Sequence, residues 1–273
     1  MNEKKYYFLA GLPRSGNTLL SSILNQNPEI SVSANSCVGD LLLDGEGRKH
    51  CPEFINFPDH KSLDDYIGSI FDSYYQNWPA KYIIDRGVWG MQNKIHLLEK
   101  HLKNEIKIIV TVRDYVEILA SFLKANPSII RHAYEAQIAQ GIRHRETYKT
   151  EIEVVCEVLS SPNSLLERTM NSLANLLQKE NRKYLHIIEY NDLVGNPKET
   201  IDGIYKFLNI PKFNHKFEDI SQFKSNGVCY NDNIMECDLH SVKKELKKSD
   251  YEVKDFMTED LILKYSGREF WRK

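Results

Sequence analysis

The chain has 273 residues, of which 41% are hydrophobic and 27% charged, and its formal net charge is -2 at pH 7. This length and composition are typical of a globular protein with a sizeable core, and we interpret residues 1–273 as a single domain. The near-neutral charge provides no overall attraction to nucleic acid or to an anionic membrane. Any anion-binding site must therefore be built locally.

Cysteine usage and the length of the apolar runs predict a cytoplasmic protein. The five cysteines are an odd number and include no Cys-x-x-Cys pair, which favours free thiols over a disulfide framework or a zinc site. No stretch approaches the ~18 consecutive apolar residues of a membrane span. The first residues also lack the apolar core of a signal peptide.

The chain opens with a predicted strand, a glycine-rich turn and a predicted helix. Residues 6–10 are an apolar run typical of a buried strand. Gly11 and Gly16 lie in the turn, and the apolar periodicity that follows predicts a helix ending near Pro28. Such a turn directs backbone N–H groups and a helix N-terminus at an anion. A tight turn that merely uses glycines is the alternative.

The spacing Gly11-x-x-x-x-Gly16-Asn17-Thr18 is that of a P-loop with one substitution. In nucleoside-triphosphate enzymes a lysine precedes the Ser or Thr and reaches the outer phosphates. Asn17 occupies that position here, and a cation is found instead inside the loop, at Arg14. The pattern disfavours ATP or GTP hydrolysis and favours a different phosphate-like ligand.

Strand and helix patterns alternate along the rest of the chain. Apolar runs predict strands at residues 30–32, 82–86, 106–112 and 184–188. Helices are predicted at residues 63–74, 91–102, 115–123 and 198–209, with a wholly helical stretch at 127–180 that breaks near 160–163. Loops are expected at residues 34–52, with one short helical turn, and at 210–238, before a tail of short helical pieces.

This alternation predicts an α/β fold: a P-loop-type parallel sheet flanked by helices, with a large helical insertion. Ligands of such sheets bind at the carboxyl ends of the strands. The rule gathers five side chains around one crevice: Arg14, Asp85, Arg86, Arg113 and Tyr190. Cations beside a P-loop favour a ligand with more than one anionic group. We expect no acidic cluster for Mg²⁺ at this crevice, and hence no metal.

Five segments occur in the order of one family's motifs. They are residues 13–19 (PRSGNTL), 112–114 (VRD) with Ser121 in the next helix, 190–193 (YNDL) before Pro197, 239–243 (LHSVK) and 270–272 (FWR). Through these segments the chain resembles sulfotransferases that use 3′-phosphoadenosine 5′-phosphosulfate (PAPS). It is most similar to bacterial sulfotransferases that resemble tyrosylprotein sulfotransferases. The likeness runs over residues 7–272.

The resemblance implies which residues hold PAPS. The 5′-phosphosulfate would be bound by the loop and the helix N-terminus, with Arg14, Ser15, Gly16, Asn17 and Thr18. The 3′-phosphate would be bound by Arg113 and Ser121, with Lys243 from the late motif and Tyr190 at the adenine end. For Arg113 the alternatives are a salt bridge to Asp114 or a helix cap, and for Tyr190 an ordinary half-buried tyrosine.

The implied reaction moves the sulfuryl group of PAPS to a hydroxyl or amine and leaves adenosine 3′,5′-bisphosphate. The acceptor would be a small molecule, a glycan or a peptide. Arg14 and Arg86 would stabilise the developing charge without a metal. Arg86 occupies the place where the family usually carries a lysine, and Lys94 is a later alternative.

The general base has three candidates. The glutamate of tyrosylprotein sulfotransferases would fall near residues 34–35, which are Ala and Asn, and Asp40 lies five residues later. His96 is a candidate because Lys94-Ile95-His96 resembles the Lys-x-His of cytosolic sulfotransferases. Asp85 ends a strand at the crevice, but its neighbour Arg86 would lower its basicity.

Two rival functions remain compatible with the pattern. A P-loop nucleotide or small-molecule kinase would share the loop, although Asn17 replaces its lysine. A nucleotide-binding module without catalysis would keep both anion sites and produce nothing from any acceptor. Turnover of ATP with Mg²⁺ would identify the kinase.

Overall fold

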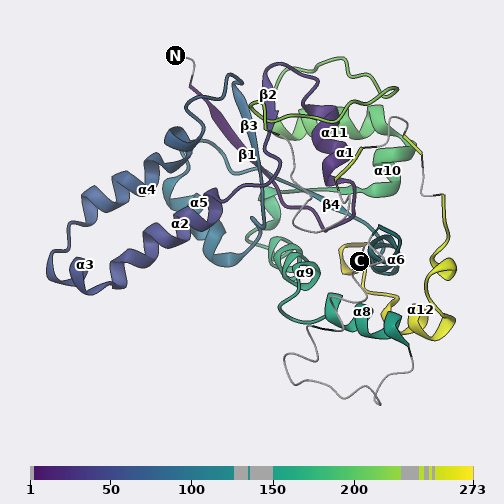
Figure 1. Cartoon of the computed structure of the whole chain (residues 1–273). Coiled ribbons are helices and arrows are strands. Elements are labelled where there is room, and N and C mark those ends of the chain that lie inside the picture. Colours follow the sequence, from purple (N-terminus) through teal and green to yellow (C-terminus); the bar gives the residue numbers. More distant parts are fainter. Residues whose placement is uncertain are drawn as a thin grey trace.

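The computed structural model describes residues 3–125, 135, 150–228, 240–242, 246–247 and 250–272. Within this part of the chain five parallel strands form one sheet, in the order β2-β3-β1-β4-β5 (Figure 1). The strands are β1 (Lys5–Leu9), β2 (Ile30–Val32), β3 (Tyr82–Arg86), β4 (Ile108–Val112) and β5 (Leu185–Glu189). All five predicted strands are confirmed, and their ends shift by at most two residues.

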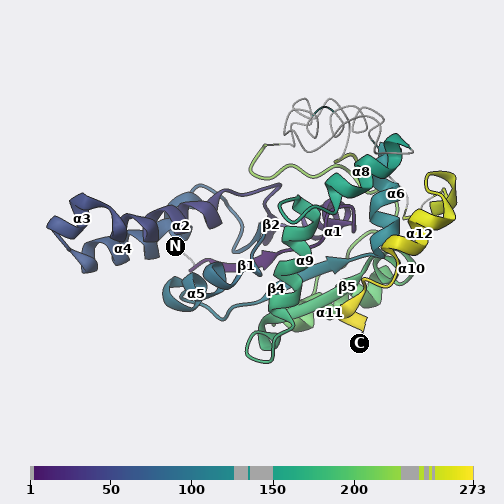
Figure 2. The same ribbon diagram turned by 90° about the horizontal axis from the view of Figure 1, so that it is seen from below.

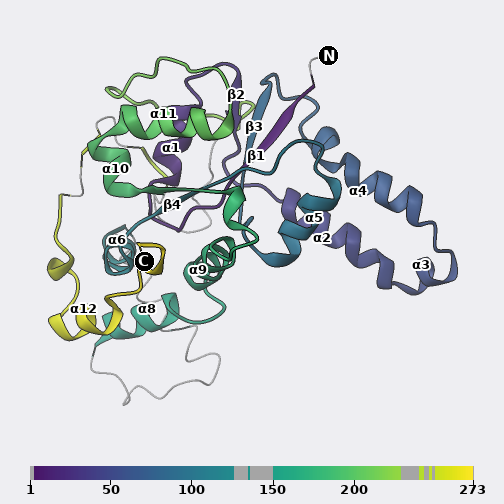
Figure 3. The same cartoon turned by 180° about the vertical axis from the view of Figure 1, so that it is seen from behind.

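Helices cover both faces of the sheet (Figures 1 and 3). One face carries α1 (Asn17–Leu24), α10 (Tyr190–Gly195) and α11 (Pro197–Leu208). The other face carries α4 (His60–Tyr74), α5 (Gln92–His101), α6 (Tyr115–Ala125), α8 (Glu151–Leu159), α9 (Leu165–Leu176) and α12 (Glu259–Tyr265). The expected α/β architecture is therefore the observed one.

Strands β1, β3, β4 and β5 supply side chains to both hydrophobic cores, whereas the edge strand β2 supplies Ile30 and Val32 to only one of them. In β1, Tyr6 and Phe8 enter the core that contains α5, α6 and α9, whereas Tyr7 and Leu9 enter the core that contains α1 and α11. β4 is buried along its whole length. A strand covered on both faces needs apolar residues at every position, which is why continuous apolar runs marked these strands in the sequence.

The order of the strands produces a topological switch point between β1 and β4. These strands are neighbours, yet the chain leaves β1 toward the β2–β3 side and leaves β4 toward β5. Their carboxyl ends therefore flank the point where the connections diverge, which is where open α/β sheets generally bind their ligands. The P-loop follows β1, and Arg113 follows β4 directly.

A helical arm projects from the sheet where the sequence predicted mostly loop (Figure 2). Residues 34–52, expected to be a loop with one helical turn, contain α2 (Val38–Gly47) and the short η1 (Arg48–His50), followed by α3 (Pro52–Asn56). Glycines made this stretch a poor helix candidate, but tertiary packing outweighs that propensity. A Cβ on Gly45 would lie 3.0 Å from Ile67 of α4, so glycine lets the two helices approach closely.

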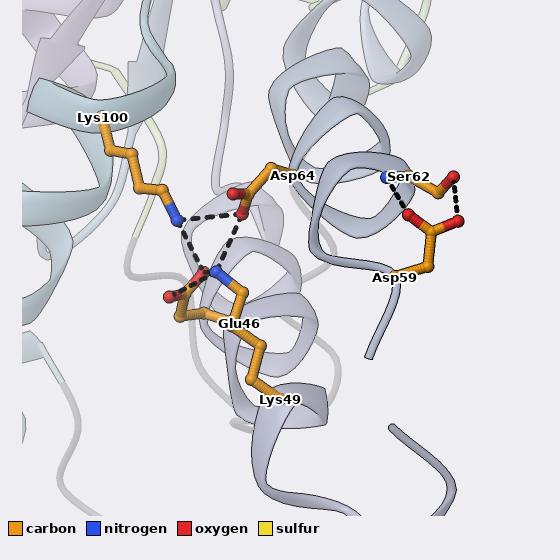
Figure 4. A network of polar contacts seen from close by, with 6 residues as sticks. All are labelled: Glu46, Lys49, Asp59, Ser62, Asp64 and Lys100. Atoms are coloured by element: carbon orange, nitrogen blue, oxygen red, sulfur yellow. Dashed lines mark hydrogen bonds and ion pairs between the residues drawn. The ribbon is translucent and has the colours of Figure 1, made fainter. Parts of the chain in front are cut away.

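An ion-pair network joins the arm to α5 (Figure 4). The Lys49 ammonium lies 2.9 Å from Glu46 and 2.8 Å from Asp64, and Lys100 of α5 lies 2.9 Å from Asp64. Hydrogen bonds from the two lysines lower the pKa of Asp64 to about 2. Glu46 and Asp64, with His101, are spaced closely enough to hold a cation, but the two ammonium groups already balance the carboxylates.

The other expected segments agree with the structure where it describes them. Within 150–180, α8 and α9 are separated by a break at residues 160–164, as predicted, while 126–134 and 136–149 lie outside the described residues. Residues 210–228 are loop, and the tail forms η5 (Val253–Asp255), α12 and η6 (Phe270–Arg272). Helix α10 was not predicted. No helix in the described ranges is long and apolar enough to cross a membrane.

Candidate functional site

The loop after β1 closes tightly against β4. The backbone N–H of Leu12 donates to the carbonyl of Thr111 at 2.8 Å, so the pairing of the two strands extends beyond the end of β1. A Cβ on Gly11 would lie 2.0 Å from Thr111 Oγ1 and 2.2 Å from Asn17 Oδ1. Glycine is required here because a side chain would occupy the space of these two polar groups.

Two loop residues adopt left-handed backbone conformations. Gly16 has φ 91°, which glycine adopts without steric cost, but Arg14 has φ 58°. A non-glycine residue in this region is uncommon, and such conformations cluster where a ligand is bound. The chain turns at Arg14, and the guanidinium extends from the loop to α6. There its Nε donates a hydrogen bond to Ser121 Oγ at 3.1 Å.

Ser15 and Asn17 hold the loop in shape. Asn17 Nδ2 donates to the Leu12 carbonyl at 2.6 Å, and its Oδ1 accepts from Thr111 Oγ1 at 3.0 Å. The Ser15 hydroxyl lies 2.7 Å from the same Thr111 Oγ1, and both side chains are buried. In this arrangement Asn17, which replaces the P-loop lysine, braces the loop against β4. Sequence reasoning missed Thr111, and a threonine inside an apolar strand was the available signal.

The N-terminus of α1 is arranged to meet an anion. Gly16 is its N-cap without a side-chain cap, and its first turn contains no acidic residue. The first N–H groups of a helix have no partner within the helix and carry a partial positive charge. Thr18, in that first turn, accepts a hydrogen bond from Arg86 Nη1 at 3.4 Å. The cation at the end of β3 therefore reaches the P-loop.

Arg113 lies at the carboxyl end of β4, next to the loop. Its Nε donates to Glu117 Oε2 at 2.8 Å, and its Nη1 donates to the Arg14 carbonyl at 3.3 Å. Its guanidinium also lies over the Tyr190 ring, 4.4 Å from the centroid. Arg14, Arg113, Ser121 and Tyr190 are therefore brought together, although they come from four separate segments.

The alternative pairing of Arg113 with Asp114 is not observed. Arg113 pairs with Glu117, one helical turn further on, whereas Asp114 pairs with Arg272 at 2.6 Å. Burial acts against the charge of the Arg113 guanidinium, but the Tyr251 hydroxyl and Glu117 outweigh it, and the pKa of Arg113 is raised. The site therefore presents a permanent cation in a largely buried position.

Arg86 is fixed by the loop that leads into the arm. Its backbone N–H donates to Ser33 Oγ at 2.7 Å, and its carbonyl accepts from the Ser36 N–H at 3.1 Å. Helix α2 begins two residues after Ser36, and Asp40 lies in its first turn. These contacts hold the start of the arm against the carboxyl end of β3, where Arg86 lies.

Asp40 is exposed and pairs with a buried lysine. Lys94 Nζ lies 3.0 Å from Asp40 Oδ1, with the Lys94 side chain 10% exposed and the Asp40 side chain 72% exposed. The ammonium also lies 5.7 Å from the centre of the Trp89 ring. A Cβ on Gly39 would come within 2.8 Å of this ammonium, so the glycine leaves room for it.

Asp85 lies at the strand end as predicted, but its side chain faces the interior. It is fully buried and accepts hydrogen bonds from Tyr75 and, at 2.8 Å, from Trp89 Nε1. Burial raises the pKa of Asp85 to about 6. The expectation that Arg86 would lower the basicity of Asp85 is wrong, because alternate residues of a strand point to opposite faces and burial dominates.

The remaining predicted site residues lie apart from this cluster. His96 is exposed on α5, two positions after Lys94 and therefore on a different side of the helix. Lys243 lies outside the described residues. The terminal motif returns to the sheet edge, where Arg272 also pairs with Glu189 at 2.7 Å. This pairing was not anticipated from the sequence.

Comparisons with known proteins identify the family and the fold. The family model of the sulfotransferase domain matches residues 4–266. Mouse sulfotransferase SULT7A1 complexed with PAP is similar in structure, with a TM-score of 0.52 and 12% identity over 96% of this chain and 81% of that one. A sulfotransferase from Alicyclobacillus acidocaldarius has a TM-score of 0.44 and 14% identity, over 78% and 84% of the two chains.

At these identities the structural likeness concerns the fold alone. No curated protein sequence matches the chain at a significant level. The family match carries the assignment, because it spans the P-loop, the arginine after β4 and almost all of the chain. The chain belongs to the sulfotransferase family.

Proposed function

We propose that the protein transfers the sulfuryl group of PAPS to an acceptor hydroxyl or amine. The observation that carries this proposal is the contact of Arg14 Nε with Ser121 Oγ at 3.1 Å, beside Arg113. It joins a P-loop suited to the 5′-phosphosulfate to an arginine and a serine suited to the 3′-phosphate. Guanidinium groups bind phosphates bidentately, and the Ser121 hydrogen can still be donated while its oxygen accepts from Arg14.

The reaction is an in-line displacement at sulfur. The acceptor oxygen or nitrogen attacks the sulfur, the bond between the sulfur and the bridging oxygen breaks, and adenosine 3′,5′-bisphosphate leaves with the electron pair. Arg86 and the α1 N-terminus would stabilise the charge that develops on the leaving oxygen. In this mechanism Arg14, Arg86 and Arg113 supply the positive charge and no metal is required.

We assign the general base to Asp40. Among the three candidates, Asp40 alone combines an exposed carboxylate with a segment bonded to Arg86. Asp85 is enclosed by Tyr75 and Trp89, and His96 lies on a different side of α5 from Lys94. Lys94 would orient the Asp40 carboxylate, which accepts the acceptor proton as the new S–O or S–N bond forms.

The acceptor is expected to carry an apolar portion. Leu41 follows Asp40 in α2 and Tyr74 is the last residue of α4, and each is 41% exposed. Cys37 connects them: its Sγ lies 3.8 Å from the Tyr74 hydroxyl, and its carbonyl accepts from the Leu41 N–H one helical turn later. Together they expose apolar surface near the N-terminus of α2, the helix that carries the proposed base.

Binding of the product nucleotide tests the proposed donor. Adenosine 3′,5′-bisphosphate is expected to stabilise the protein without added metal, by ~2.7 kcal/mol at about 100 times its Kd. For a chain of this size the melting temperature should rise by about 5 °C or more, as measured by thermal denaturation in EDTA. A larger shift with ATP and Mg²⁺ than with the bisphosphate would instead support the rival kinase function.

Arg113→Ala tests the 3′-phosphate subsite. The affinity for adenosine 3′,5′-bisphosphate should fall by ~1.5–3 kcal/mol, because a charged hydrogen-bonding partner is lost. Affinity for 5′-AMP, which has no 3′-phosphate, should fall far less, and calorimetric titration of both ligands measures the difference. Equal losses for the two nucleotides would show that Arg113 has only a structural role.

A further inference from the structure

One guanidinium near the C-terminus binds the carboxyl ends of two neighbouring strands, β4 and β5. Arg272 Nη1 lies 2.6 Å from Oδ1 of Asp114, which stands two residues beyond β4. Its Nε and Nη2 donate to the two carboxylate oxygens of Glu189, the last residue of β5, at 2.8 and 2.7 Å. The buried Trp271 adds a hydrogen bond from Nε1 to Glu189 Oε1 at 2.9 Å. Arg272 therefore holds both carboxylates at once.

Both carboxylates adjoin residues of the candidate site. Asp114 directly follows Arg113, and Glu189 directly precedes Tyr190. The Arg113 guanidinium lies over the Tyr190 ring, 4.4 Å from its centroid. Two negative charges are thus carried by the same strand ends as the cation that follows β4. Opposite charges attract strongly where access of solvent is limited, so these carboxylates are natural competitors for Arg113.

The observed pairing keeps this competition from arising. Arg113 donates to Glu117 on α6 at 2.8 Å, whereas Asp114 and Glu189 both pair with Arg272. Burial acts to raise the pKa of Glu189, but hydrogen bonds from Arg272 and Trp271 outweigh it, and that pKa is lowered. Glu189 therefore remains negatively charged at neutral pH and needs the charge of Arg272.

We propose that Arg272 is a positioning residue of the donor site, which holds Asp114 and Glu189 so that they do not compete with the donor for the N–H groups of Arg113. This role rests on the proposed function. Without Arg272, the Asp114 carboxylate, whose side chain is 33% exposed, would lose its partner beside another arginine. Carboxylates and phosphates bind the same face of a guanidinium, so an ion pair between Arg113 and Asp114 would oppose binding of the donor.

Arg272→Gln is the direct test, measured by calorimetric titration with adenosine 3′,5′-bisphosphate. The Kd should rise roughly fivefold, the upper end for an ion pair that solvent reaches, since the Arg272 side chain is 44% exposed. Adding Asp114→Asn to this variant should restore most of the affinity, because the main competitor is then neutral. Loss of packing alone would not be reversed by a second substitution. Thermal denaturation checks that each variant is folded.

Arg268→Gln is the matched control. Arg268 lies in the same segment, with its side chain 35% exposed, and pairs with Glu167 of α9 at 2.7 Å. Its replacement removes an ion pair of the segment but leaves both strand-end carboxylates with Arg272, so the Kd should not change. If Arg272→Gln does not fold, Arg272→Lys takes its place, because lysine lacks the planar fork that binds two carboxylates. Its Kd should also rise and be restored by Asp114→Asn.

The outcomes separate this assignment from the proposed function. A rise in Kd that Asp114→Asn reverses, with Arg268→Gln unchanged, supports the role of Arg272. An unchanged Kd in the folded Arg272 variant, a rise that Asp114→Asn does not reverse, or an equal rise in Arg268→Gln overturns that role and leaves the proposed function standing. If the wild-type protein does not bind the bisphosphate, the proposed function and the role of Arg272 both fall.

Discussion

Replacing Asp40 with asparagine is expected to lower kcat roughly 10²–10⁴-fold, the range over which a positioned general base contributes. The amide keeps the size of the side chain but cannot accept the acceptor proton. Donor affinity should stay unchanged, because Asp40 lies on α2 and not in the P-loop or beside Arg113. Steady-state kinetics with PAPS and a reactive acceptor, together with bisphosphate titration, measure the two quantities separately.

Asp44→Asn is the matched control for Asp40. It lies one helical turn further along α2 and is exposed, so its replacement should leave kcat unchanged. Near-full turnover in Asp40→Asn would contradict the assignment, and a large loss in His96→Ala would then identify the histidine as the base. If neither substitution costs even about tenfold, the acceptor reacts without a dedicated base.

Arg86→Gln is expected to lower kcat roughly 10²–10³-fold, the loss typical of one preorganised group that stabilises transition-state charge. The Arg86 guanidinium reaches Thr18 in the first turn of α1, where the leaving oxygen would lie in the proposed mechanism. The Kd of the bisphosphate should change much less, since this charge is greatest in the transition state. Arg86→Lys should recover part of the rate, because it restores a point charge without the planar fork.

The exposed Arg182, which precedes β5, provides the control for Arg86. Arg182→Gln removes one positive charge from the protein at a position outside the proposed site, so kcat should not change. A large rise in the bisphosphate Kd of Arg86→Gln with kcat preserved would contradict the transition-state role. It would show that Arg86 binds the donor equally in the ground state and the transition state.

Local patterns predicted the strands and the anion-binding loop for physical reasons. A central parallel strand is buried on both faces, and the resulting apolar runs at β3 and β4 can be recognised without any tertiary information. The P-loop requires small residues at fixed spacing because its backbone turns sharply and lies against β4, as the 2.0 Å clash of a Cβ on Gly11 shows. The apolar runs and the glycine spacing can be recognised within single segments, although one of the groups that excludes a side chain at Gly11 is Thr111, in the distant strand β4.

The sequence did not predict the helices of the arm, because contacts with distant segments of the chain stabilise them. The sequence of α2 contains three glycines and a modest apolar pattern, which by propensity favour a loop. The helix forms because Val38 and Leu42 enter the core and because Gly45 permits close contact with α4. A pattern within one segment cannot reveal which other segment will cover it.

The sequence by itself determined the fold class, the P-loop, the position of Arg113 at a strand end and the spacing from Arg113 to Ser121. Only the tertiary structure decided the partners of these groups. Arg14 meets Ser121 across 107 positions, and Lys94 meets Asp40 across 54. Asp85 is turned inward, away from the crevice in which sequence reasoning placed it. The physical reason is that periodicity and turn chemistry act between neighbours in the chain, whereas a charged side chain takes its partner and its pKa from whichever segments the topology brings beside it.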